Sequence, residues 1–120
     1  MAGGGPFAVR GGDSGGGTTT AFAGRSPGVT AEMVREGDTG MLRLSNVHQL
    51  PPDRVLQAWV QRGKTVESAD VLFAPNSDGV AAAVIDDMNG VDIVMVTTEP
   101  RGGSTTPTSK PLVSIPVSSS

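Results

Sequence analysis

The longest unbroken apolar run in this chain is the six-residue segment Val80–Ile85. A helix that crosses a membrane needs about 20 apolar residues, and a run of six is also short for a buried helix. The other apolar residues recur in short stretches separated by glycine, proline, asparagine and aspartate, which is typical of strands joined by turns. The chain is therefore expected to fold mainly as β-strands.

A hairpin is predicted early in the apolar part of the sequence. Met41–Val47 places Leu42 and Leu44 on one face and polar side chains between them, the period of two expected of a half-buried strand. The segment Val29–Arg35 precedes it, and the turn sequence Glu36–Gly40 joins the two. Together these segments indicate two antiparallel strands.

A second pair of strands is expected later in the chain. Val91–Glu99 is apolar on both faces beyond Asp92, which favours a central position in a sheet. Val80–Ile85 precedes it, and the turn between them contains Asn89-Gly90, a dipeptide typical of tight hairpins.

The segment Arg54–Arg62 has two interpretations. As a helix it has Pro52 and Asp53 at its start and Gly63 as its cap. As a strand it divides into two alternating sets, Leu56, Ala58 and Val60 against Val55, Gln57 and Trp59. Nine residues is short for a helix and the neighbouring segments favour strands, so the strand is preferred. Trp59 is then expected to be a core residue, with surface stacking on a ligand as the less favoured alternative.

The ends of the chain differ in composition from the middle. Residues 1–28 are glycine-rich and are expected to form a flexible leader, with a possible edge strand at Thr18–Phe22. Residues 29–116 are expected to form the folded domain, which includes a final strand at Pro111–Ile115, and residues 117–120 a frayed tail. Short strands separated by turn signals, with no convincing helix, predict an all-β sandwich or barrel.

Composition excludes several classes of function. The formal net charge is −3 and the basic residues are scattered, so no nucleic-acid partner is expected. The chain has no cysteine, which excludes disulfides, thiolate nucleophiles and cysteine-ligated zinc.

One short motif resembles the nucleophile loop of chymotrypsin-like proteases, namely Gly12-Asp13-Ser14-Gly15-Gly16. In that family the triad residues follow the order His, Asp, Ser. Here the only histidine, His48, comes after Ser14, and the serine lies in the glycine-rich leader. A flexible linker is therefore the preferred interpretation, and no enzyme activity is expected.

The candidate metal ligands are equally sparse. His48 alone cannot form a histidine-rich site and is expected in a loop. Asn76–Gly79 matches only a fragment of a calcium loop. Asp86, Asp87 and Asp92 could approach one another across the predicted hairpin and hold calcium weakly, but a solvated acidic turn is preferred. No metal or cofactor is expected.

From about residue 29 onward the chain resembles a known family. Three stretches carry the resemblance: Met41–Val47 leading into Leu50-Pro51-Pro52, then Leu56-Gln57-Ala58-Trp59-Val60, then Val96-Thr97-Thr98-Glu99-Pro100-Arg101-Gly102-Gly103-Ser104 followed by Pro107. They resemble motifs of the C-terminal extracytoplasmic domain of anti-sigma-K factors. Leu56 stands where that family usually has tyrosine, and the cysteine pair of some members is missing.

The resemblance implies an all-β, antiparallel, immunoglobulin-like β-sandwich of about seven to eight short strands on the extracytoplasmic face of a bacterial cell membrane. It implies a single-pass parent protein whose N-terminal domain binds a sigma factor and whose membrane helix lies upstream of Met1. Residues 1–28 would then be the membrane-proximal tether. A signal, often transmitted by regulated proteolysis, would release the sigma factor, so a protease or envelope protein is a possible partner. The motif residues are expected to be structural: Leu50, Pro51, Pro52, Gln57, Trp59, Glu99, Pro100, Gly102 and Gly103. The alternative is a secreted or surface-attached β-sandwich module that binds a protein or a glycan.

Overall fold

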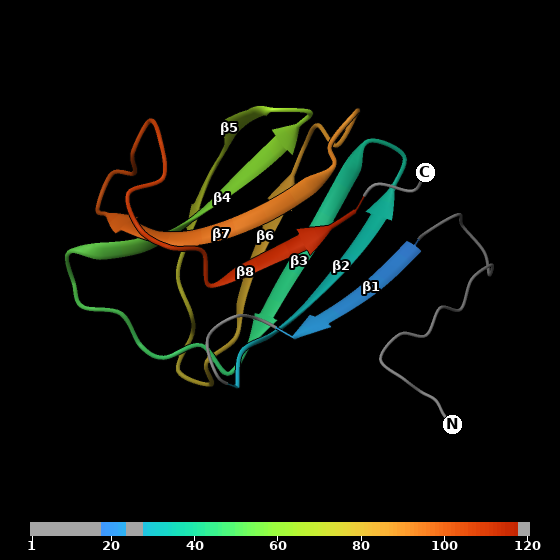
Figure 1. Cartoon of the computed structure of the whole chain (residues 1–120). Coiled ribbons are helices and arrows are strands. Elements are labelled where there is room, and N and C mark those ends of the chain that lie inside the picture. The colour runs from blue at the N-terminus through green and yellow to red at the C-terminus, as the bar shows by residue number, and fades with distance from the viewer. Residues whose placement is uncertain (1–17, 24–27, 118–120) are drawn as a thin grey trace, which may run out of the picture.

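A computed structural model describes residues 18–23 and 28–117, and within these residues the chain forms strands and no helix (Figure 1). The strands are β1 (Thr18–Ala23), β2 (Thr30–Glu36), β3 (Thr39–Ser45), β4 (Arg54–Arg62), β5 (Thr65–Phe73), β6 (Ala81–Ile85), β7 (Ile93–Pro100) and β8 (Val113–Pro116). Most of the predicted leader, including Ser14, lies outside the described residues, whereas its possible edge strand is β1.

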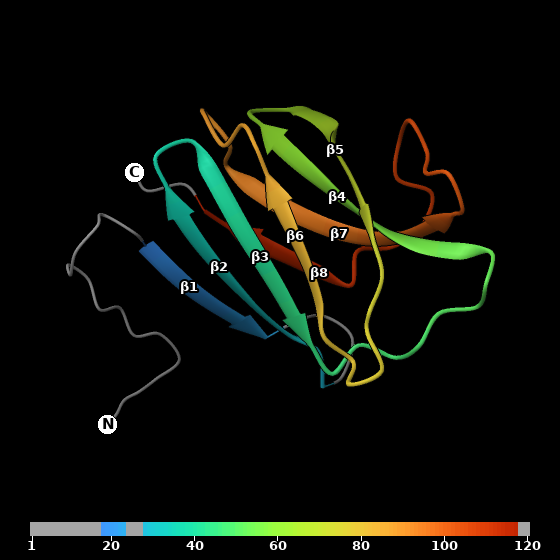
Figure 2. The same ribbon diagram turned by 180° about the vertical axis from the view of Figure 1, so that it is seen from behind.

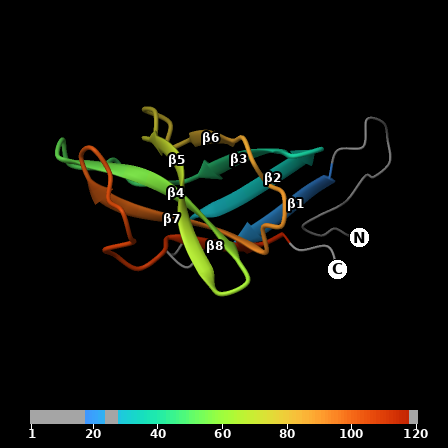
Figure 3. The same ribbon diagram turned by 90° about the horizontal axis from the view of Figure 1, so that it is seen from above.

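The strands form two antiparallel four-stranded sheets. Sheet A has the order β1-β2-β3-β6 and sheet B the order β5-β4-β7-β8. Figures 1 and 2 show the two sheets from opposite sides. Figure 3 shows β5 and β6, which are edge strands of sheet B and sheet A, side by side. The predicted all-β sandwich is confirmed. When β2 to β8 are lettered A to G, the sheets read A-B-E and D-C-F-G. This order differs from the ABED and CFG sheets of immunoglobulin constant domains only in that β5 pairs with β4 and not with β6, so the likeness extends to the strand order.

Most segments predicted from alternation become the expected strands. β2 and β3 form the predicted hairpin, with Met33 opposite Leu42. The ambiguous segment Arg54–Arg62 is a strand, β4, and pairs with both β5 and β7. β7 lies between β4 and β8, which confirms its central position.

The predicted hairpin between Val80–Ile85 and Val91–Glu99 is wrong. β6 pairs with β3 in sheet A, whereas β7 pairs with β4 and β8 in sheet B, so the connection between them crosses from one sheet to the other. Met88 in this connection is completely buried among the core residues, and its backbone N–H donates to the Asp38 carbonyl at 2.7 Å. Burial of the Met88 side chain in the core favours this crossing over a tight turn at Asn89-Gly90.

The main core lies between the two sheets. Sheet A contributes alternate residues of its strands, for example Met33, Leu42 and Leu44, and sheet B contributes Leu56 and Val96. The residues that alternate with these core residues along each strand therefore lie on the outer faces of the sandwich.

Candidate functional site

Three motif residues, Gln57, Trp59 and Glu99, lie on one face of sheet B. Gln57 pairs with Thr97 across β4 and β7, and Trp59 and Glu99 each lie two residues further along their own strand, so all share a face. Their neighbours in β4, including Leu56, pack in the core between the sheets. The motif residues are therefore on the outer face of sheet B.

The connection between β7 and β8, residues 101–112, folds against this outer face and is called the strap. Ser104 and Thr108 in the strap both bond to side chains of the motif residues. At its far end the strap is fixed by the Leu112 N–H, which donates to the Val96 carbonyl at 2.7 Å.

Trp59 is completely buried, but it lies outside the apolar cluster between the sheets. Its indole Nε1 donates to Thr97 Oγ1 at 2.8 Å, and Thr97 Oγ1 donates to Glu99 Oε2 at 2.5 Å. The expected burial of Trp59 is thus confirmed, but it lies in a second, smaller buried region on the outer face of sheet B and not in the cluster between the sheets. A fully buried indole has no surface on which a ligand can stack.

Glu99 is a carboxylate with 0% exposure whose oxygens accept several hydrogen bonds. Besides Thr97, the donors are Ser104 Oγ at 2.9 Å, the Thr108 backbone N–H at 3.1 Å and the Thr108 hydroxyl. Burial raises the pKa of Glu99, but the hydrogen bonds from Thr108, Thr97 and Ser104 outweigh it and lower the pKa below its ordinary value. The two salt bridges of the described residues involve Arg62 and not Glu99, so hydroxyl and amide donors stabilise this charge.

The side chain of Gln57 holds the strap through the backbone of Ser104. Its Oε1 accepts from the Ser104 N–H at 2.9 Å, and its Nε2 donates to the Ser104 carbonyl at 3.0 Å and to Ser68 Oγ at 2.9 Å. Gly103 brings Ser104 to this position with φ +86, and a Cβ there would lie 3.1 Å from Leu72 Cδ2 and 3.2 Å from Gln57 Oε1. Glycine is therefore required by both conformation and space.

The motifs Leu50-Pro51-Pro52 and Glu99-Pro100 meet at one end of sheet B. Pro100 pairs with Arg54 at the ends of β7 and β4. The next residue, Arg101, donates its N–H to the Asp53 carbonyl at 2.8 Å, and the Arg54 N–H donates to the Pro51 carbonyl at 3.0 Å. Leu50 packs against the main core, whereas both Pro51 and Pro52 are exposed. The three sequence motifs are thus joined in one region around the strap.

Comparison with known proteins agrees with this arrangement. Residues 8–112 match the family model described as "Anti-sigma-K factor rskA, C-terminal". The chain belongs to this family. It is 30% identical over 99 residues to the anti-sigma-K factor RskA of Mycolicibacterium vanbaalenii, an alignment that covers 80% of this chain and 42% of that protein. The chain therefore spans less than half the length of this curated relative. No solved structure matches it.

Within the described residues of this anti-sigma-K domain, no helix has the length and apolar character needed to cross a membrane. Two of the three acidic residues considered for calcium, Asp87 and Asp92, have other partners. Asp87 pairs with Arg62 at 3.5 Å, and Asp92 Oδ2 accepts from the Gly63 N–H at 2.8 Å. Residues 18–23 and 28–117 contain no group of three potential metal ligands.

The remaining candidates have local roles. Asn76 Oδ1 accepts from the N–H groups of Asp78 at 2.9 Å and Val80 at 3.0 Å, so it closes the turn between β5 and β6. His48 is exposed in the loop between β3 and β4. Neither residue takes part in the network around Glu99.

Sequence reasoning missed four members of the network: Thr97, Ser104, Ser68 and Thr108. Thr97 had a signal, because it lies two residues before Glu99 in a strand and so shares its face. Thr108 had none, because its distance from Glu99 depends on the path of the strap. The network adjoins a polar pocket of about 680 Å³ that is lined by Gln57, Glu67, Ser68, Asp70, Leu72 and residues 102–105.

Proposed function

We propose that this chain is the extracytoplasmic regulatory domain of a membrane-bound anti-sigma factor and that it has no catalytic activity. Membership of the anti-sigma-K family supports the assignment. The partial coverage of the relative supports a parent protein in which other segments bind the sigma factor and cross the membrane. In this proposal a signal acts on the domain, and regulated proteolysis of the parent protein releases the sigma factor.

The hydrogen-bond network supports a non-catalytic role. A serine or threonine nucleophile needs an adjacent general base. Here the hydroxyls of Ser104 and Thr108 donate to Glu99, whose lowered pKa makes it a weak base, and the network contains no imidazole. Among the described residues, no buried side-chain nitrogen or oxygen lacks a hydrogen-bond partner. These groups hold the strap on sheet B.

The location can be tested with engineered cysteines, because the chain has none of its own. In the natural full-length parent, Ser77→Cys adds a thiol at an exposed turn position, and Ala58→Cys adds one at a fully buried position. A membrane-impermeant maleimide should label Ser77→Cys in intact cells and Ala58→Cys only after denaturation. The parent without either substitution is the background control.

Labelling of Ser77→Cys only after lysis would contradict the extracytoplasmic location. Recovery of the parent from the medium, with no membrane-bound fraction, would favour the alternative of a secreted binding module.

Co-purification tests whether the sigma factor binds segments of the parent protein outside this domain. A sigma factor should co-purify with the full-length parent and also with a parent that lacks residues 18–117. It should not co-purify with the 120-residue chain alone. Binding of the sigma factor by the isolated chain would contradict the proposal.

A further inference from the structure

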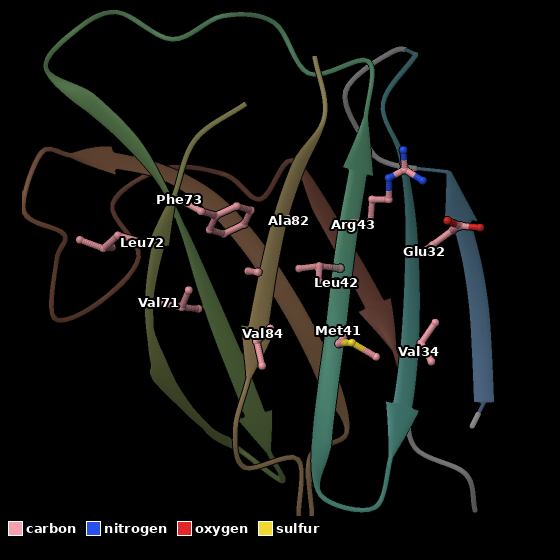
Figure 4. Close-up of a pocket in the computed structure, with 11 residues that line it drawn as sticks. Glu32, Val34, Met41, Leu42, Arg43, Val71, Leu72, Phe73, Ala82 and Val84 are labelled. Atoms are coloured by element: carbon pink, nitrogen blue, oxygen red, sulfur yellow. The ribbon is translucent and has the colours of Figure 1, made fainter. Parts of the chain in front are cut away.

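The outer face of sheet A carries a row of three apolar side chains, of which Met41 and Val84 are exposed and Val34 is half-buried. Val34 of β2 lies opposite Met41 of β3, and Met41 lies opposite Val84 of β6, so the row crosses three adjacent strands (Figure 4). Met41 is 42% exposed and Val84 51%. An exposed contiguous apolar surface of this kind often marks an interaction site.

The row forms the floor of a groove of about 500 Å³. Val71 and Phe73 of β5 form its wall, because β5 belongs to the other sheet and runs beside the edge strand β6 (Figure 4). The side chain of Leu72 between them points away from the groove, toward Gly103 of the strap. The groove therefore contains two of the four large apolar side chains most exposed in the described residues, Met41 and Val84.

The neighbouring row of the same face carries one acidic and one basic residue. Glu32 lies opposite Arg43, and Arg43 lies opposite Ala82 (Figure 4). Both charged residues are exposed, and neither forms a salt bridge within the described residues.

We propose that this face, defined by Glu32, Val34, Met41, Arg43 and Val84, is a homodimer interface. In a two-fold dimer each patch meets its own copy. A two-fold axis through the face places the apolar rows against each other and Glu32 of one copy opposite Arg43 of the other. A patch that carries a negative and a positive charge beside an apolar row is complementary to itself. A patch whose charges all have the same sign would repel its copy.

The geometry suits the packing of one sheet on another. Facing β-sheets pack through alternate side chains that interdigitate, and the outer face of sheet A offers such a set beside the wall of β5. The inference goes beyond the proposed function and does not depend on it. If the domain is attached to a membrane, confinement raises its effective concentration, so a weak contact is sufficient for dimerisation.

The first test is sedimentation equilibrium of the full 120-residue chain over a wide range of concentration. A reversible monomer–dimer equilibrium is expected. Val84→Glu should weaken it by about tenfold or more, because the dimer would bury an unpaired charge. The matched control is Val66→Glu, which adds the same charge at an exposed apolar position outside the groove and should leave the dimer unchanged.

The second test distinguishes pairing between copies from pairing within one chain. Glu32→Arg and Arg43→Glu should each weaken the dimer, because each creates a patch of one sign. When the two variants are mixed, Arg at position 32 faces Glu at position 43 of the other chain, and a heterodimer should form. If Glu32 and Arg43 act only within one chain, mixing should leave both variants monomeric.

Three results would overturn the proposal. A monomer at every concentration excludes the dimer, provided that circular dichroism shows a folded chain. A dimer insensitive to Val84→Glu lies on another face. A monomer that dimerises only after removal of residues 1–17 would assign the face to the N-terminal segment of the same chain.

Discussion

The outer faces of the two sheets contrast in a way that hydrophobicity alone does not explain. On sheet B, the carboxylate of Glu99 is completely buried beneath the strap. On sheet A, Val84 is 51% exposed. The comparison shows that burial on these faces is decided by what covers them. The strap supplies the donors that a buried carboxylate requires, and none of the described segments lies over the groove of sheet A in this way.

The contrast suggests different roles for the two faces. The outer face of sheet B is completed within the chain, so its residues should contribute mainly to the stability of the fold. The outer face of sheet A is incomplete, so its residues should contribute mainly to association. Substitutions on the two faces should therefore separate these effects.

The largest expected effect is that of Glu99→Ala. This substitution leaves the donors of Thr97, Ser104 and Thr108 without their acceptor, and we expect a loss of about 3 kcal/mol in the free energy of unfolding. Urea unfolding followed by Trp59 fluorescence measures it. Glu36→Ala removes an exposed carboxylate and should change stability by no more than about 0.5 kcal/mol. Equal effects of the two substitutions would refute the special role of Glu99.

Acid should weaken the hydrogen bonds between Glu99 and the strap. The pKa of Glu99 is lowered in the folded state, so its stabilising contribution is complete above the pKa of an unfolded glutamate, about 4.3, and is lost as the pH falls through the folded pKa. The urea midpoint of the wild-type chain should fall in this acidic range. Glu99→Gln should show a smaller dependence over the same range, and an identical pH profile for both proteins would contradict the assignment.

Gly103→Ala tests whether the strap must approach sheet B closely. The added Cβ has an unfavourable φ and lies 3.1 Å from Leu72 Cδ2, so we expect a loss of about 2 kcal/mol. Gly102→Ala is the matched control, because φ is +96 but no atom lies within 4 Å of the added Cβ. It should cost about 1 kcal/mol from backbone strain alone. A smaller loss for Gly103→Ala than for Gly102→Ala would mean that the strap does not need this close approach.

The smallest effect on folding is expected on sheet A. Val84→Thr replaces a half-exposed side chain with a similar shape that also suits a strand, so the free energy of unfolding of the monomer should change by no more than about 0.5 kcal/mol. The measurement is urea unfolding at low protein concentration. A loss comparable with that of Glu99→Ala would mean that this face is part of the core.

Alternation predicted the strands well because it reports which side chains are buried. It placed the β2–β3 hairpin. For Arg54–Arg62 it left a helix open, and the short length and the neighbouring strands favoured β4, whose two sets of residues do face opposite sides of sheet B. It could not tell which sheet a strand joins. The Asn89-Gly90 dipeptide indicated a hairpin, but burial of Met88 takes the chain across to the other sheet.

The site was predictable to the extent that it depends on neighbours in sequence. The family resemblance singled out Gln57, Trp59 and Glu99, and strand periodicity places them on one face. That this outer face is buried could not be predicted, because Ser104 and Thr108 reach it through the path of a loop. The exposed row on sheet A also depends on pairing between distant strands, since Met41 meets Val84 only through the β3–β6 register.

The strap seals the outer face of sheet B over Glu99, to which Trp59 is joined through Thr97. The most direct measurement is the fluorescence of Trp59, which is the only tryptophan in a chain without tyrosine. We predict blue-shifted emission that iodide quenches weakly in the native protein, and a red shift with stronger quenching in Glu99→Ala under conditions where circular dichroism shows a folded chain. Red-shifted emission from the folded wild-type protein, quenched as freely as in urea, would contradict the account.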